Sequence, residues 1–349
     1  MTEIARQLID ALKHGNYLQE NDFLQILTHA DTEDVEYAKS SANTLRIANF
    51  GQAIFLRGLV EFTNYCKNDC LYCGIRRSNT DVIRYRLTKE QILDCLEQGY
   101  AAGLRTLVLQ GGEDAWFTDE RMCDIVSSVK SRRPDIAVTL SLGERSKENY
   151  RRLKEAGADR YLLRHETATE WHYAKLHPSF QKFSNRMQCL EWLKELGYQV
   201  GCGMMIGSPF QTAECLASDL AFIQRFRPQM VGLGPFIPHQ ATPFAKEPAG
   251  SVETTLLMLS LVRLTLPKVL LPSTTALATL HPQGRLRGIL AGANVIMPNL
   301  SPVDLRDNYT LYDHKANTGL EAVEGVALLD KELSTIGCHV VVDRGDALY

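Results

Sequence analysis

Residues 53–73, AIFLRGLVEFTNYCKNDCLYC, join a predicted strand to a loop with three cysteines. Apolar side chains dominate the first part of this stretch, which predicts a buried strand over residues 53–61. Cys66, Cys70 and Cys73 come soon after the strand ends. In folds built on parallel strands, active sites form where the strands end, so these thiols occupy a position typical of catalytic groups.

The rest of the chain alternates between strand-like and helix-like stretches. The further strand-like runs are 105–110, 136–142, 160–165, 198–205, 230–234, 268–272 and 294–298. Helix-like runs separate them, at 88–102, 118–132, 146–156, 184–196, 212–226, 251–266 and 283–291, with a last helix in the 303–337 region. This α/β alternation, with no long polar linker, predicts a parallel sheet closed into a (β/α)8 barrel of the TIM type. An open doubly wound sheet is the alternative, but no Gly-rich dinucleotide fingerprint follows the first strand.

The chain before the first strand is predicted to be helical. Two or three helices fill residues 3–48, with Asn21 and Asp31 as helix-start residues. We therefore expect residues 1–48 to pack as helices on the barrel. Residues 49–349 are expected to form the barrel as a single structural unit.

Composition narrows the class of protein. The chain has 349 residues and a net charge of −3, which gives no bulk electrostatic reason to expect a nucleic-acid or membrane partner. No signal-peptide core and no transmembrane run is present in the sequence. Nine cysteines without a secretion signal predict a reducing, cytoplasmic location, where clustered cysteines bind metal more often than they form disulfides.

The three clustered cysteines have the chemistry of an iron–sulfur site. A structural zinc ion takes four ligands, whereas the next cysteine after the loop is Cys95 and the next histidine is His165. Three thiolates on a [4Fe–4S] cluster leave one iron open to a small ligand. The alternatives are a chance grouping of cysteines and a zinc site completed by a distant residue.

The spacing Cys-x3-Cys-x2-Cys, with Tyr72 before the last cysteine, resembles the motif of the radical S-adenosylmethionine (SAM) superfamily. Other segments, between about residue 50 and about residue 312, are similar to one family within it, the [FeFe]-hydrogenase maturase HydE. The segments begin at Val60 (VEFTNYC), Val108 (VLQGGED), Thr139 (TLSLGE), Gly157 (GADRYLLRHETA), Gly234 (GPFIPH), Pro272 (PSTTA) and Gly292 (GANVIMPN). Methylornithine synthase resembles the chain around the first strand, but the Arg-His-Glu-Thr and Ser-Leu-Gly-Glu stretches are similar to HydE.

The resemblance implies a SAM site on the barrel rim. Arg186 matches the family's arginine for the SAM carboxylate, a group that a guanidinium binds with two hydrogen bonds. Glu166 matches a residue that faces the methionine end of SAM. The other implied SAM contacts are Tyr72, Gly111, Gly112, Glu113, Tyr309 and Tyr312. For the lone glutamate and tyrosines, an exposed charge or an ordinary packing ring is the alternative.

The substrate is expected inside the barrel. Leu162, Arg164 and Glu166 alternate onto one face of the fourth predicted strand, so Arg164 should point into the cavity with Glu166. The resemblance implies further lining residues: Arg57, Thr139, Thr274, Thr275 and Met297. Two arginines and several hydroxyls would hold a carboxylate- or cyanide-bearing ligand. The resemblance implies that the substrate is a small organometallic or amino-acid-like molecule. Alternatively, Arg57 and Arg164 form structural ion pairs, with Glu61 as a partner.

The implied activity is cleavage of SAM to a 5′-deoxyadenosyl radical during assembly of the hydrogenase di-iron subcluster. It implies an electron donor such as ferredoxin or flavodoxin, and the sister maturase HydG as a partner. A radical SAM enzyme acting on an amino-acid-like substrate and a non-catalytic iron–sulfur or zinc protein are the alternatives. Some HydE members have a second cluster near the chain end; here residues 312–321 contain no cysteine, so we expect one cluster only. His165 is expected to be a core histidine and His239 to lie in a solvated loop.

Overall fold

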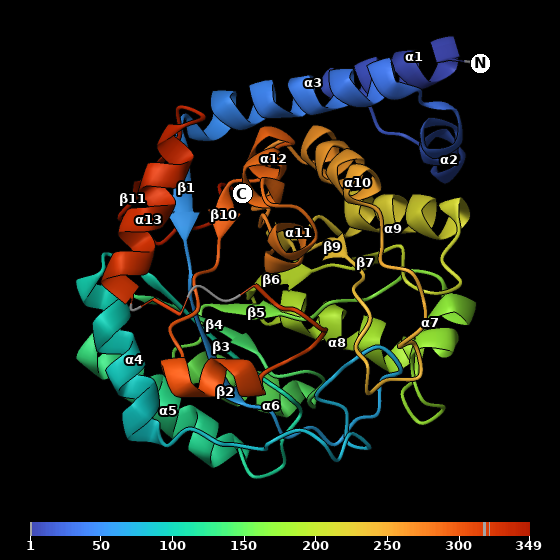
Figure 1. Cartoon of the computed structure of the whole chain (residues 1–349). Helices are drawn as coiled ribbons and strands as arrows, with labels where there is room; N and C mark the ends of the chain where they lie inside the picture. Colours follow the sequence, from blue (N-terminus) through green and yellow to red (C-terminus); the bar gives the residue numbers. More distant parts are fainter. Residues whose placement is uncertain (1, 317–318, 321) are drawn as a thin grey trace.

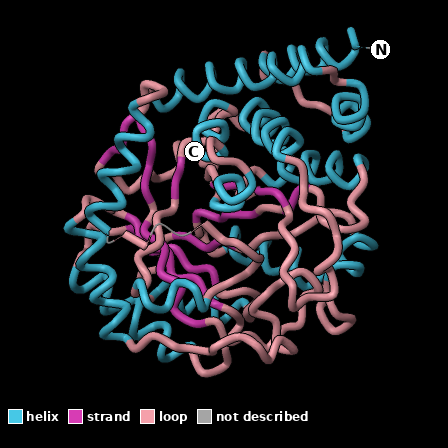
Figure 2. Tube along the Cα trace, viewed as in Figure 1, coloured by secondary structure: helices cyan, strands magenta, loops and turns pink. Residues whose placement is uncertain are grey.

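The computed structural model describes residues 2–316, 319–320 and 322–349 as a barrel of parallel strands surrounded by helices (Figures 1 and 2). The strands are β1 (Ala53–Leu56), β2 (Gly58–Thr63), β3 (Thr106–Gly111), β4 (Ala137–Ser141), β5 (Arg160–Leu162), β6 (Gln199–Cys202), β7 (Met205–Ile206), β8 (Met230–Val231), β9 (Gly234–Pro235), β10 (Val295–Ile296) and β11 (His339–Val341). Six of them pair in the order β2-β3-β4-β5-β6-β8, all parallel.

Single parallel bridges close this sheet into a barrel. Met230 pairs with Leu270, and Pro272 pairs with Val295 at the start of β10. β10 in turn lies parallel to β1. The predicted seventh strand, 268–272, therefore takes its place in the barrel only through isolated bridges. Pro272 has no N–H to donate, which prevents a continuous ladder there.

The helices match the predicted periodic stretches closely. Those of the barrel are α4 (Lys89–Ala101), α5 (Asp119–Arg132), α6 (Lys147–Glu155), α7 (Glu170–Leu176), α8 (Phe183–Glu195), α9 (Ala213–Phe226), α10 (Val252–Thr265), α11 (Thr275–Leu280), α12 (Gly284–Leu290) and α13 (Ala322–Ser334), with a short 3-10 helix at Val303–Asn308. Side-chain hydroxyls accept from backbone N–H groups at the starts of five of them, at Thr88, Thr118, Ser146, Thr212 and Ser251. The short helices α7 and α11 were not predicted.

Three helices precede the barrel: α1 (Thr2–Lys13), α2 (Glu20–His29) and α3 (Thr32–Phe50). They lie against α9 and α10 on one side of the barrel (Figure 1). Ile9, Phe23 and Ile26 are fully buried and belong to the main hydrophobic core. Asp31 starts α3 as expected, whereas Gln19 rather than Asn21 starts α2. The division at residue 48 stays a prediction.

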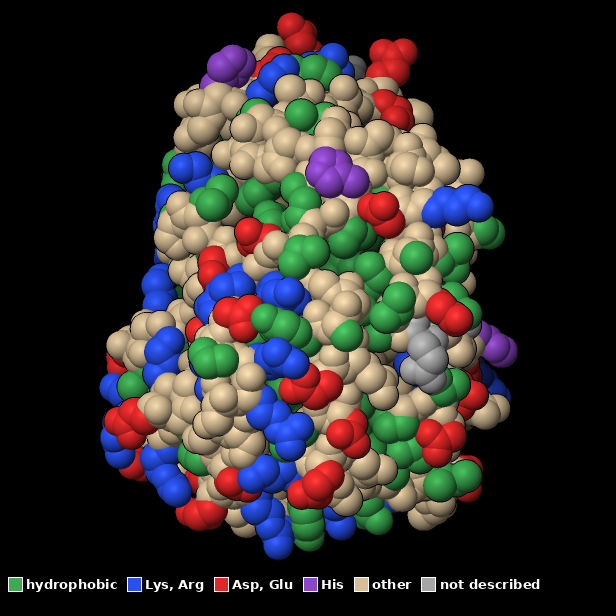
Figure 3. Space-filling view, turned by 90° about the vertical axis from the view of Figure 1, so that its left-hand side faces the viewer, with side chains coloured by type: hydrophobic (Ala, Val, Ile, Leu, Met, Phe, Trp, Pro, Cys, Tyr) green, Lys and Arg blue, Asp and Glu red, His purple; other side chains and the backbone are tan. Residues whose placement is uncertain are grey.

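The face over α4 and α13 carries charges of both signs. Lys and Arg side chains lie among Asp and Glu side chains over the lower part of this face (Figure 3). Such mixing leaves no field of a single sign on this side of the protein. Among the described helices, none is long and apolar enough to cross a membrane.

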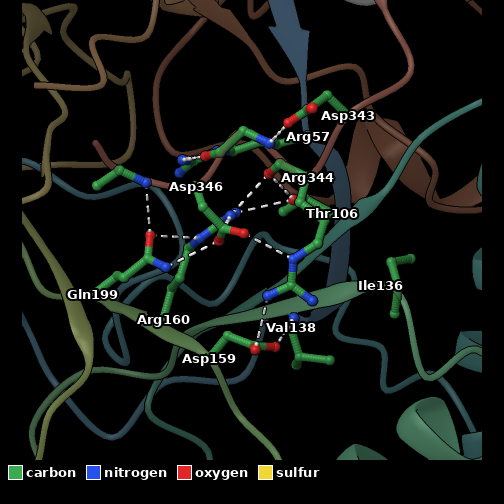
Figure 4. A network of polar contacts seen from close by, with 12 residues as sticks. Arg57, Thr106, Ile136, Val138, Asp159, Arg160, Gln199, Asp343, Arg344 and Asp346 are labelled. Atoms are coloured by element: carbon green, nitrogen blue, oxygen red, sulfur yellow. Dashed lines mark hydrogen bonds and ion pairs between the residues drawn. The ribbon is translucent and has the colours of Figure 1, made fainter. Parts of the chain in front are cut away.

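The C-terminal residues close the floor of the barrel, the end where the strands begin. Arg160 Nη2 donates to Asp346 Oδ1 over 2.6 Å, and Gln199 Nε2 donates to the same oxygen over 2.9 Å (Figure 4). Arg344 Nη2 donates to Asp159 Oδ1 over 3.0 Å. The last residues of the chain thus hold the first residues of β5 and β6 together, a contact that the strand pattern did not predict.

Candidate functional site: a thiol loop and charged residues on the barrel rim

The thiol loop leaves β2 at the rim and is held by one internal arginine. Arg84 Nη1 donates to the carbonyl of Ile75 over 2.8 Å, and Nη2 donates to those of Arg76 and Asn79 over 2.7 and 3.0 Å. Asn64 Nδ2 donates to the carbonyl of Ile83 over 2.8 Å. Side chains of the loop's own segment therefore help to order its backbone, together with backbone contacts to Glu113, Leu176 and Leu311.

The thiols of Cys66, Cys70 and Cys73 are half-buried neighbours on this loop. Burial raises the pKa of all three thiols, that of Cys73 to about 12, and the nearby Cys66 thiol raises it further in both Cys70 and Cys73. Grouped thiols of raised pKa give up their protons when a metal centre supplies the compensating positive charge.

The donor set fits a [4Fe–4S] cluster in type and number, since each thiolate serves a different iron. In the described part of the chain, no three His, Cys, Asp or Glu side chains are arranged for a single metal ion. The assignment of the three cysteines as cluster ligands stays a prediction.

Arg186 and Glu166 lie beside the thiol loop, as expected. The charges of both residues influence the pKa of the Cys70 thiol. Arg186 is buried at the start of α8, where its Nε donates to Glu144 Oε1 over 2.7 Å and its Nη1 donates to the carbonyl of Arg164 over 2.6 Å. Glu166 has a φ of 66°, a left-handed conformation that costs energy in a residue other than glycine. Strain of this kind clusters at functional positions.

Arg164 does face the same side as Glu166, but it has an acidic partner. Its Nη2 lies 3.3 Å from Glu166 Oε2, at ion-pair distance but without the alignment of a hydrogen bond. The alternative that Arg164 forms an ion pair is therefore realised, with Glu166 as its partner. The pair replaces part of the hydration that Arg164 loses.

Gly111, Gly112 and Glu113 end β3 against the thiol loop. A Cβ at Gly112 would lie 2.2 Å from the carbonyl oxygen of Tyr65 and 2.8 Å from Cys66 Cβ. Glycine here permits close packing of the cluster loop, and its contact with SAM stays a prediction. Glu113 Oε2 lies 3.0 Å from Lys67 Nζ, and its carbonyl accepts from the Lys67 N–H over 2.9 Å.

Three tyrosines of the expected SAM site surround the loop. Tyr72 is joined to His177, with 3.2 Å between its hydroxyl and Nε2, and burial raises its pKa well above the usual value. Tyr309 is buried, and its pKa is raised by burial and by the charge of Glu61. Tyr312 is half-buried, with a pKa raised to about 12 by burial. The roles of these three tyrosines in SAM binding stay predictions.

The predicted substrate residues divide between the inner wall and the floor. Thr139 and Thr274 each have a buried hydroxyl oxygen without a hydrogen-bond partner among the described residues. Met297 is half-buried against the small cluster around Leu162. Thr275 begins α11, near Thr274.

Arg57 lies apart from Arg164, at the floor. Its Nη2 donates to the carbonyl of Gly345 over 3.4 Å, and burial, followed by the charge of Arg160, lowers its pKa well below the usual value. The geometry therefore gives no support to a joint anion site of Arg57 and Arg164. The alternative of structural ion pairs is realised for one of the two arginines: Arg164 pairs with Glu166, whereas Glu61 pairs with Lys315.

Several residues of the site had no sequence signal. Gln181 accepts from Cys70 Sγ over 3.3 Å, and Glu144, which holds Arg186, stood in a matching segment without being singled out. His165 is a core histidine as expected, with Nε2 3.1 Å from Asp219 Oδ1. His239 is buried against the thiol loop, so the expectation of a solvated loop is wrong. Only its proximity to the rim pointed to it.

The 309–316 segment covers this rim. The Gly74 N–H donates to the carbonyl of Leu311 over 2.9 Å, and Lys315 Nζ donates to the carbonyl of Tyr309 over 3.1 Å. Residues 312–321 contain no cysteine that could bind a second iron–sulfur cluster. Asn317, Thr318 and Glu321 of this segment lie outside the described residues.

Comparisons with known proteins agree with this geometry. The model of the radical SAM superfamily matches residues 60–223. The [FeFe] hydrogenase maturase subunit HydE of Thermotoga maritima is 41% identical over 333 residues, which cover 95% of this chain and 92% of the relative.

Solved structures show the same fold. Methylornithine synthase (PylB) superposes with a TM-score of 0.85 at 27% identity, over 96% of this chain and 97% of that one. HydG, a maturase of the [FeFe]-hydrogenase, superposes with a TM-score of 0.82 at 19% identity, over 97% of this chain and 76% of that one. At this low identity, the likeness shows a shared fold only.

Proposed function

The chain is a radical SAM enzyme that belongs to the HydE family, and from this premise we propose that it acts in assembly of the [FeFe]-hydrogenase di-iron subcluster. Its cofactors are those of the superfamily, a [4Fe–4S] cluster and SAM. Membership removes the alternative of a non-catalytic iron–sulfur or zinc protein. Identity of 41% along 95% of the chain is the observation that carries the proposal.

Different residues of the rim would hold the cluster and SAM. The three loop cysteines would hold the cluster, and Arg186, fixed by Glu144, would bind the SAM carboxylate. Glu166 and Glu113 would face its amino group. When bound, the cluster would supply the one-electron reduction that cleaves SAM to methionine and a 5′-deoxyadenosyl radical. The part of this chain is to position SAM and to exclude water from it.

Two features of the rim support water exclusion. Tyr72 and His177 stand against each other beside the thiol loop, with ring centroids 5.5 Å apart. Burial lowers the pKa of His177 to about 3, so its ring is neutral at pH 7 and adds no charge near the sulfonium. The 309–316 segment covers the loop from the other side through the contact between Gly74 and Leu311.

We further propose that the small-molecule substrate binds near Arg164 and the hydroxyl of Thr274; Thr139 lies lower, where it lines a small cavity with Arg57 and Arg160. The Thr274 hydroxyl is buried without a partner in the described chain, and a ligand would supply one. Because Glu166 already pairs with Arg164, an anionic substrate would compete for that arginine. In Arg164→Met, hydrogenase maturation should fall at least tenfold, whereas SAM cleavage without substrate should persist. Normal maturation would place the substrate elsewhere.

A methylornithine synthase-like activity is the second candidate, because PylB shares the fold over nearly the whole chain at 27% identity. The substrate would then be an amino acid, which carries an ammonium group and a carboxylate. The Arg164–Glu166 pair offers both charges for such a zwitterion, so the geometry of the wall does not separate the two substrates.

Complementation separates them. Expression of this chain in a strain that lacks only its HydE should restore hydrogenase activity, while the Cys70→Ser variant should not. Lack of rescue by a soluble, cluster-loaded protein would contradict the maturase proposal, and formation of methylornithine in vitro would establish the second candidate. HydG as a partner and a cytoplasmic location remain proposals that the same strain can test by co-purification and fractionation.

A further inference from the structure

One carboxylate from a surrounding helix holds the turn that carries Glu166. Asp219 lies in α9, outside the strands of the barrel, and its side chain is fully buried (Figure 1). Its Oδ1 accepts from the Ala168 N–H over 2.5 Å and lies 3.1 Å from His165 Nε2. The two residues that it contacts stand on either side of Glu166 in the chain. A single oxygen atom therefore fixes both ends of this turn.

His165 extends the contact to the neighbouring strand. Its Nδ1 accepts from the N–H of Gly203, the residue after β6, over 3.2 Å. The ring proton therefore sits on Nε2, which donates it to Asp219. The carbonyl of Gly203 in turn accepts from the Glu166 N–H over 3.0 Å. The backbone of Glu166 and the ring beside it are thus held by the same glycine.

These contacts stand where the sheet no longer guides the chain. β5 ends at Leu162, and beyond it a single parallel bridge joins Glu166 to Met204. Glu166 itself has a φ of 66°, in the left-handed region that a residue with a side chain avoids. A strained residue of this kind persists only where the surrounding structure over-determines its conformation. The contacts of Asp219 and His165 supply that constraint.

The constraint has a cost that packing alone does not explain. Asp219 Oδ2 is buried and has no hydrogen-bond partner among the described residues. A buried carboxylate with an unbound oxygen is less favourable than an apolar side chain of the same shape. The carboxylate therefore serves the turn that its other oxygen holds, and that turn directs the Glu166 side chain toward Arg164 on the rim.

We propose that Asp219 and His165 are positioning residues for SAM, and that they act through the Glu166 carboxylate. The inference rests on the proposed function, in which Glu166 faces the SAM amino group. Because the turn is already fixed, the carboxylate meets the ammonium group of SAM without first having to be ordered. A binding group held in place in this way loses less conformational entropy when the ligand arrives.

The test is a double-mutant cycle with a control from the same helix. Asp219→Leu removes the acceptor, and Gln224→Leu is the control. Gln224 is buried in α9 and makes two hydrogen bonds to the backbone of Leu18, of 2.8 and 3.2 Å, so it serves the N-terminal helices. Each change is also made in a Glu166→Ala background. SAM affinity is measured by calorimetry on cluster-loaded protein without a reductant. Stability in urea and amide hydrogen exchange of residues 165–168 are measured on cluster-free protein.

Asp219→Leu should weaken SAM binding about tenfold, because the charged partner of the ammonium group is no longer held in place. Amide exchange of residues 165–168 should become faster. In the Glu166→Ala background, the same change should weaken SAM binding by less than about twofold, since the two residues act as a unit. Gln224→Leu should lower the urea midpoint but leave SAM affinity unchanged in both backgrounds.

An equal loss of SAM affinity in both backgrounds would overturn the inference, because Asp219 would then act on the fold and not through Glu166. Unchanged SAM affinity in folded Asp219→Leu would overturn it as well. If Asp219→Leu does not fold, His165→Phe takes its place in the cycle and is judged by the same outcomes, since its ring can keep the packing against Phe222. Unchanged SAM affinity in Glu166→Ala alone would also overturn the inference, by removing Glu166 from the SAM site. The maturase proposal is tested separately, by complementation.

Discussion

Replacement of Gly112 by alanine tests whether packing of β3 against the thiol loop sets the cluster site. The new Cβ would meet the Tyr65 carbonyl oxygen at 2.2 Å and Cys66 Cβ at 2.8 Å. Ordinary contact begins near 3.4 Å, so one side must move by about 1 Å. The Gly112 N–H is bonded to the carbonyl of Thr63 over 3.1 Å, which fixes the strand side. The loop, and Cys66 with it, must therefore shift.

The expected cost has two parts. Overpacking at such a site destabilises a protein by about 1–3 kcal/mol, which urea denaturation of the cluster-free protein would show. Displacement of a catalytic group by about 1 Å can lower a rate roughly 100-fold, so SAM cleavage should fall by that order. Iron bound after anaerobic reconstitution should drop well below the roughly four atoms per chain of one [4Fe–4S] cluster.

Gly325→Ala is the matched control. A Cβ at Gly325 would meet no heavy atom within 4 Å, and the residue lies inside α13. Alanine there should stabilise the protein by roughly 0.5–1 kcal/mol, without effect on iron or activity. If Gly112→Ala binds as much iron and cleaves SAM as fast as Gly325→Ala, the packing argument is refuted.

Three further changes test other parts of the molecule. Cys70→Ser should abolish SAM cleavage. The wild type should bind about four iron atoms per chain, whereas about eight iron atoms would disprove the prediction of a single cluster. Arg186→Met should weaken SAM binding at least tenfold. Because the change also removes the hydrogen bond to Glu144, the free energy of unfolding of the cluster-free protein should fall by about 1.5–3 kcal/mol. If titrations show unchanged SAM affinity, the role of Arg186 is purely structural. Burial raises the pKa of Asp346, but hydrogen bonds from Arg344, Gln199 and Arg160 more than offset this and lower the pKa well below its usual value. The stability that this carboxylate contributes is therefore fully present above about pH 4 and lost as the pH falls further, so urea curves of Asp346→Asn and the wild type should differ at pH 7 and converge below pH 4. A gap that persists at low pH would show that charge is not the cause.

Local patterns were enough to predict the barrel and the thiol loop. Apolar runs of strand length between amphipathic stretches placed most strands and helices within a residue or two, because their periods follow from backbone geometry. The spacing of Cys66, Cys70 and Cys73 indicated the chemistry, since three thiols so close in sequence are close in space in any loop. Arg164 and Glu166 do lie on one side, as predicted, but β5 ends at Leu162, so this is not the work of strand alternation.

Local patterns could not predict how deep a side chain lies in the barrel or which residues it contacts. Alternation assigns a side chain to the interior of a barrel but not to its floor or its rim. Arg57 therefore pointed inward as expected, and only the path of the chain end, with Gly345 beneath it, showed that it lies at the floor. The segment 268–272 had a strand-like composition, but its ladder depends on neighbours far away in sequence and on Pro272.

The elements, the cysteine motif and the family resemblance could be predicted from local patterns, because they depend on periodicity and spacing over a few residues. Which charges meet could be seen only in the folded barrel. Glu144 fixes Arg186 from 42 residues away, and Lys315 reaches Glu61 across 254. Gln181 reaches Cys70 from 111 residues away. Such pairs form because barrel closure brings the ends of separate strands to one rim, and no local pattern records which of them will be neighbours.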